Sequence, residues 1–148
     1  MKRIIALSGL LYLATPAFAA DPWLGTWVQR GKKPMTMTIE KAGASGAKFT
    51  YRMPPEFKPN MVMTFETQFD GNEVPVFVDG KPIDETMVVK RIDDRHTAAS
   101  WKIQGEPGGS STSELSADGK VIKAESDNEV PGLDGKTGKV TLYWDKKS

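Results

Sequence analysis

The sequence predicts an all-β domain, more specifically an antiparallel up-and-down barrel of about eight to ten strands. Short runs in which apolar and polar residues alternate recur at the roughly 8–12 residue spacing of sandwiches and barrels. Asp-Gly pairs, which favour tight hairpin turns, stand between several of these runs. Parallel strands would need long crossovers, for which the chain has no room. A meander of hairpins is therefore the simplest topology, and its closure removes the exposed edges of the sheet.

Residues 1–19 have the pattern of an export signal that is removed from the mature protein. A positive head (1–3) precedes an apolar stretch (4–13), and an Ala-Phe-Ala cleavage site ends at Ala19. The apolar stretch is shorter than the run of about 20 residues that a membrane-spanning helix needs. The chain has no cysteine that a lipid anchor would use. We expect a single domain of residues 20–148, soluble in the bacterial periplasm.

The first four strands are predicted from alternation with a period of two. Residues 24–30 open the domain, and in 35–41 methionine and isoleucine alternate with threonine and glutamate. Residues 48–53 place Phe, Tyr and Met on one face, and 61–69 separate Met and Phe from Thr, Glu and Gln. Successive side chains of a strand point to opposite faces, so each of these strands has one face for a core.

Six further strands are predicted in the second half of the chain, where turn residues separate short β-like runs. They are residues 74–78, 86–93, 97–104, 111–116, 121–126 and 139–145. Glycine adopts positive φ at little cost, so the Asp-Gly pairs are expected to form hairpin turns. These pairs are Asp70-Gly71, Asp79-Gly80, Asp118-Gly119 and Asp134-Gly135.

Two connections, 54–59 and 105–109, are rich in proline or glycine. Proline cannot donate a hydrogen bond to a sheet, so 54–59 is not a central strand. We interpret 105–109 as a flexible loop. The 54–59 loop is expected at the rim of an opening into the barrel.

Composition argues against several classes of function. The 20 Lys+Arg and 19 Asp+Glu residues nearly balance, whereas nucleic acids are held mainly by a basic field. The chain has no cysteine, one histidine (His96) and no Gly-x-Ser-x-Gly motif, so nucleophilic catalysis lacks its usual residues. No phosphate-binding or dinucleotide motif is present in the sequence. We expect a non-catalytic protein without a cofactor.

The motif Leu24-Gly25-Thr26-Trp27 is similar to the Gly-x-Trp signature that opens the first strand of lipocalins and fatty-acid-binding proteins. Further short motifs lie at 69–71, 74–76, 90–93 with Thr97, and 115–120. With these, the chain resembles small exported bacterial proteins of lipocalin-like (calycin) type, most of unknown function. The resemblance implies an up-and-down barrel with an interior site for a small apolar ligand. It also implies that Trp27 closes the floor against a basic side chain of the last strand, where the nearest cations are Lys146 and Lys147.

The sequence therefore favours binding of a small, mainly apolar molecule inside the barrel. Methionine is flexible and polarizable and recurs on adaptable binding surfaces, and aromatic rings add stacking. The expected ligand contacts are Trp27, Met37, Phe49, Tyr51, Met63, Phe65 and Trp101. Alternation also fits a barrel filled by its own side chains, because a pattern predicts burial and not empty volume.

Two other functions remain open at this point. Thioether sulfur suits Cu(I), and the two Met-x-Met pairs with the histidine form a possible copper set. This set is Met35, Met37, Met61, Met63 and His96. The third function is a protein-interaction module, such as a hydrolase inhibitor, that acts through loops or a sheet face.

Overall fold

The computed structural model describes residues 21–54, 56, 61–132 and 135–148, and these form ten antiparallel strands that close into a barrel. The strands are β1 (Gly25–Gln29), β2 (Thr36–Ala42), β3 (Gly46–Arg52), β4 (Val62–Thr67), β5 (Asp70–Val78), β6 (Lys81–Asp93), β7 (His96–Ile103), β8 (Glu106–Leu115), β9 (Val121–Asn128) and β10 (Gly138–Lys146). The described residues contain no helix, so none is available that is long and apolar enough to cross a membrane. The predicted all-β barrel is confirmed. The expected signal peptide (1–19) and most of the 54–59 loop lie outside the described residues.

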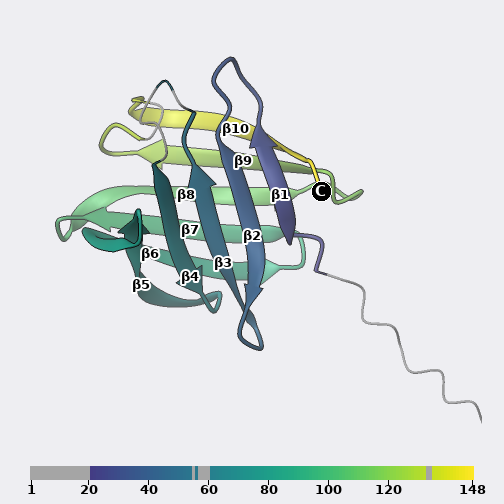
Figure 1. The fold of residues 1–148 in the computed structure, drawn as a ribbon, viewed down its shortest axis with the longest axis horizontal. Helices are drawn as coiled ribbons and strands as arrows, with labels where there is room; N and C mark the ends of the chain where they lie inside the picture. Colours follow the sequence, from purple (N-terminus) through teal and green to yellow (C-terminus); the bar gives the residue numbers. More distant parts are fainter. Residues whose placement is uncertain (1–20, 55, 57–60, 133–134) are drawn as a thin grey trace, which may run out of the picture.

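Each strand pairs with its neighbour in sequence, and β1 closes the barrel by pairing with β10. The alternation that predicted the strands places their apolar faces inside, since β2, β3 and β4 pair in register. Figure 1 shows β1 to β4 crossing in front of β6 to β10, so these two groups form facing walls of the barrel. Connections alternate between its two ends. We call the end with the β1–β2, β3–β4 and β9–β10 connections the loop end, and the other end the floor.

The turn chemistry explains where several strands meet. Asp79 and Gly80 both have positive φ (49° and 79°) and join β5 to β6 in a two-residue turn, as the Asp-Gly pattern predicts. Gln104 and Gly105 do the same between β7 and β8, with φ of 54° and 77°. The interpretation of 105–109 as a loop is therefore wrong, because a tight turn at its start lets β8 begin at Glu106.

The Asp70-Gly71 pair was expected to be a hairpin turn, and this expectation is wrong. Both residues lie in β5, where the pairing with β6 shifts register between Asp70 and Glu73. The positive φ of Gly71 (80°) thus serves a bulge in the strand, while the chain reverses just before it. A hairpin turn and a bulge both need a residue with positive φ, which glycine adopts easily, so the Asp-Gly dipeptide alone does not distinguish a turn from a bulge.

The floor is built around Trp27, which is fully buried with 0% of its surface exposed. Its indole N–H donates to the backbone oxygen of Trp23 at 3.0 Å, and the Trp23 indole donates to the Asp94 oxygen at 2.9 Å. The Lys146 ammonium lies 5.2 Å from the centroid of the Trp27 ring and donates to the Pro22 oxygen at 3.0 Å. Residues 22–23, just before β1, are thereby held across the base of the barrel.

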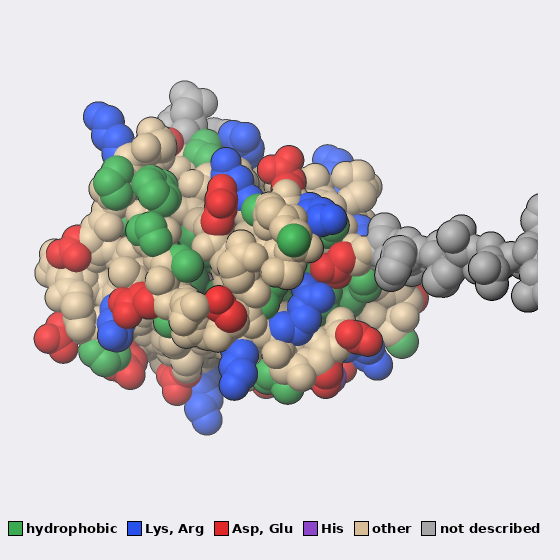
Figure 2. All heavy atoms as spheres, turned by 90° about the horizontal axis from the view of Figure 1, so that it is seen from below, with side chains coloured by type: hydrophobic (Ala, Val, Ile, Leu, Met, Phe, Trp, Pro, Cys, Tyr) green, Lys and Arg blue, Asp and Glu red, His purple; other side chains and the backbone are tan. Residues whose placement is uncertain are grey.

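The outer surface carries charges of both signs. Figure 2 shows Lys and Arg side chains interspersed with Asp and Glu, with a group of apolar side chains toward one side of that face. The apolar residues exposed by more than a third include Ile83, Ile92 and Tyr143. Tyr143 is covered in part by the guanidinium of Arg30, 5.2 Å from its ring centroid.

Candidate functional site

The interior of the barrel contains a cavity of about 330 Å³. It extends from Trp23 at the floor to Pro131 and Gly132 in the β9–β10 connection at the loop end. This volume lies at the lower end of the roughly 300–1,000 Å³ range of small-molecule sites. The barrel is therefore not filled by its own side chains.

One wall of the cavity is apolar and comes from β2, β3 and β4. Register places Phe49 opposite Phe65, and their rings stack with centroids 4.9 Å apart and an interplanar angle of 9°. Tyr51 lies between Met37 and Met63 in the next row toward the loop end. The strand alternation of the sequence thus produces a continuous surface of aromatic and thioether groups, suited to an apolar molecule.

The wall from β7, β8 and β9 is lined largely by small side chains, many of which are polar. Ser111 is paired with Ser126, and Thr97 is paired with Ser113 two residues further toward the floor. Asn128 lines the same wall nearer the loop end. Sequence reasoning missed these residues, because serine and threonine are usual on a solvent face. Their spacing of two along β8 and β9 was the available signal.

Among the described residues, Tyr51 and Glu85 are the ionisable side chains that line the cavity, and burial shifts both toward the neutral form. Burial raises the pKa of the Tyr51 phenol well above its ordinary value, so the hydroxyl is protonated at neutral pH. Burial also raises the pKa of the Glu85 carboxyl. Among the described residues that line the cavity, Glu85 is the single member of the Asp, Glu, Lys and Arg group.

Six of the seven expected ligand contacts line this cavity. They are Met37, Phe49, Tyr51, Met63, Phe65 and Trp101. The seventh, Trp27, is not among the lining residues but belongs to the core of the floor. It follows that Trp27 supports the base of the barrel and does not contact the cavity.

The Trp101 indole packs against the backbone of two glycines of β8, Gly108 and Gly109. A Cβ added to Gly108 would lie 2.5 Å from Cδ1 of the indole, and a Cβ added to Gly109 would lie 2.5 Å from Cζ2. Real Cβ atoms do not approach so closely, so the ring lies directly against the β8 backbone. The glycines that suggested a flexible loop instead make room for one aromatic side chain of the cavity lining, Trp101.

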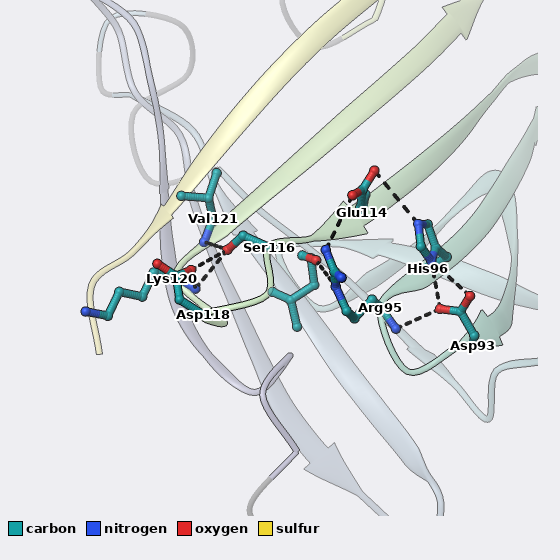
Figure 3. A network of polar contacts seen from close by, with 9 residues as sticks. Asp93, Arg95, His96, Glu114, Ser116, Asp118, Lys120 and Val121 are labelled. Carbon is teal, nitrogen blue, oxygen red and sulfur yellow. Dashed lines mark hydrogen bonds and ion pairs between the residues drawn. The ribbon is translucent and has the colours of Figure 1, made fainter.

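The five residues proposed for copper are not brought together. Met35, Met37 and Met63 line the cavity, whereas Met61 and His96 do not. His96 lies at the β6–β7 turn, where Figure 3 shows it between two carboxylates. Its Nδ1 is 2.7 Å from an Asp93 oxygen and its Nε2 is 3.8 Å from Glu114. Within the described part of the chain, no group of three or more His, Cys, Asp or Glu residues is arranged to hold a metal ion.

Comparisons with known proteins add no function. No protein-family model matches the chain, and a search of curated proteins finds no match.

Proposed function

We propose that this barrel binds a small, mainly apolar molecule in its interior and carries out no reaction on it. The observation that carries the proposal is the cavity of about 330 Å³ with a continuous aromatic and methionine wall. Removing apolar surface from water supplies roughly 25 cal/mol per Å². An apolar guest seated against Phe49 and Met63 gains this stabilisation on several sides at once.

The resemblance to lipocalin-like proteins supports the same class of function. That resemblance implies a basic side chain from the last strand packed on Trp27, and Lys146 has this contact at 5.2 Å. The last strand was expected to end at residue 145, but β10 extends to Lys146, which pairs with Trp27. The setting we propose is the periplasm, on the strength of the export pattern in residues 1–19.

The first test is uptake of an apolar fluorescent probe by two variants that differ by one position. Ala99 lines the cavity, and its neighbour Ala98 in β7 does not. We expect Ala99→Phe to occupy the cavity and to reduce probe affinity at least about tenfold, a change of about 1.4 kcal/mol. Ala98→Phe should bind as the parent protein does. Equal affinity of both variants for the probe would refute an interior site.

A natural ligand can be sought by native mass spectrometry of the protein isolated from its own cells. An added mass that disappears on denaturation would identify the guest. An addition equal to the mass of copper would instead support the methionine-based alternative.

A further inference from the structure

The polar wall contains a compact patch of four hydroxyl groups. Ser111 and Ser126 face each other across β8 and β9, and Thr97 and Ser113 do so across β7 and β8. All four side chains line the cavity. We call these four residues the hydroxyl patch. Figure 1 shows that β7 to β9 lie behind β2 to β4, so the patch and the aromatic wall belong to facing sides of the barrel.

None of these four hydroxyls donates to or accepts from another described residue. The side-chain hydrogen bonds of the protein involve other serines and threonines, such as Ser116, which bonds to Asp118 at 2.6 Å. All four residues are half-buried, so their hydroxyls remain accessible and can bond to a molecule in the cavity. The hydroxyl patch therefore has its full capacity to donate and accept directed into the cavity.

The charge of the cavity restricts the guest further. The described lining residues include no Lys or Arg, and Glu85 contributes a carboxyl toward the loop end. An anion that enters such a site loses its hydration without gaining a cation. A fatty-acid carboxylate or another organic anion is thus a poor guest, although the aromatic wall suits its apolar part.

We propose that the cavity selects a neutral molecule with an apolar body and with hydroxyl or carbonyl groups along one edge. The apolar body lies against the aromatic wall of β2 to β4, and the polar edge exchanges hydrogen bonds with the hydroxyl patch. This inference rests on the proposed function and adds to it the chemical class of the ligand.

The test uses three probes that share one ring system and differ in their polar group. Naphthalene has none, 2-naphthol has a neutral hydroxyl, and 2-naphthoate has a carboxylate at neutral pH. Their dissociation constants are measured for the parent protein and for two double variants. The first variant, Ser111→Ala with Ser126→Ala, removes the central pair of the hydroxyl patch. The control, Ser100→Ala with Ser110→Ala, removes a cross-strand serine pair that does not line the cavity.

We expect the parent protein to bind 2-naphthol at least about tenfold more tightly than 2-naphthoate. The Ser111/Ser126 variant should weaken 2-naphthol about fivefold, the value of one net hydrogen bond, and leave naphthalene unchanged. The control should change neither affinity.

Three results would overturn the inference. They are 2-naphthoate binding as tightly as 2-naphthol, 2-naphthol binding that is insensitive to the Ser111/Ser126 change, and equal losses for naphthalene and 2-naphthol. If naphthalene binds in any of these cases, the apolar site stands and only its selectivity is refuted. If none of the three probes binds, the proposed function fails together with this inference.

Discussion

Replacing Trp27 by phenylalanine tests whether the packing and the hydrogen bond of this residue in the floor stabilise the barrel. The change removes the indole N–H that donates to the Trp23 oxygen at 3.0 Å in a buried position. A buried carbonyl left without its donor costs about 1–3 kcal/mol. The two ring carbons that are also lost add about 1.6 kcal/mol at roughly 0.8 kcal/mol per buried CH₂. We expect the free energy of unfolding to fall by about 3–5 kcal/mol, a large part of the 5–15 kcal/mol typical of a domain.

The control is the same substitution at Trp101, which lines the cavity and donates no hydrogen bond to a described residue. Trp101→Phe should cost less than about 1.5 kcal/mol, since Trp101 is only half-buried and the change leaves no acceptor unsatisfied. Both variants are measured by urea unfolding with far-UV circular dichroism, which follows the loss of the β-sheet. The m-value should stay unchanged if only stability has altered. A cost for Trp27→Phe no greater than that for Trp101→Phe would refute this account of the floor.

Three further predictions concern packing and surface charge. Gly108→Ala should displace the Trp101 indole and lower the free energy of unfolding, measured with urea, by about 1–3 kcal/mol. It should also shift the tryptophan emission, and an unshifted spectrum would contradict the close packing of Trp101 on Gly108. The Asp93 carboxylate accepts from the Arg95 backbone N–H at 2.8 Å and contacts the neighbouring histidine, and both hold its pKa below the ordinary value. The ionised carboxylate therefore stabilises the fold above the ordinary pKa of Asp93, and this stabilisation is lost as pH falls through the lowered pKa of the folded state. Asp93→Asn should remove this part of the decrease in the urea midpoint at acidic pH, as measured by urea unfolding at a series of pH values. Arg30→Met breaks an exposed two-bond pair with Asp145 and should lower the urea midpoint only slightly, an effect that vanishes in about 1 M salt.

The sequence predicted the apolar wall well because alternation carries the necessary information. A strand with a period of two has one face for the interior, and Phe49 and Tyr51 lie on that face of β3. Register with the neighbouring strands then follows from hairpin pairing, which brings Phe65 opposite Phe49. Six of the expected contacts line the cavity for this reason.

The remaining parts of the site depend on information that a local pattern does not contain. Trp27 has the alternation of a wall residue, but it lies in the middle of the short strand β1, next to the floor, where Lys146 covers it. Gly108 and Gly109 read as a loop, since nothing in the sequence indicates that an indole from the paired strand rests on them. Both errors concern which residue, distant in sequence, a side chain contacts. Such contacts are determined by the closed barrel and not by the local sequence pattern.

The cavity itself results from the difference between the two walls. On β2 to β4 the inward positions carry large side chains such as Phe49 and Met63. On β7 to β9 many inward positions carry small side chains such as Ala99, Ser111 and Ala124, beside larger ones such as Trp101. Small side chains facing large ones leave the volume that packing would otherwise remove. A barrel selected only for stability gains from filling such space, because each buried methylene contributes about 0.8 kcal/mol. The small inward residues therefore support the proposed role in holding a guest, and the hydroxyls among them are the groups that would bond to its polar edge.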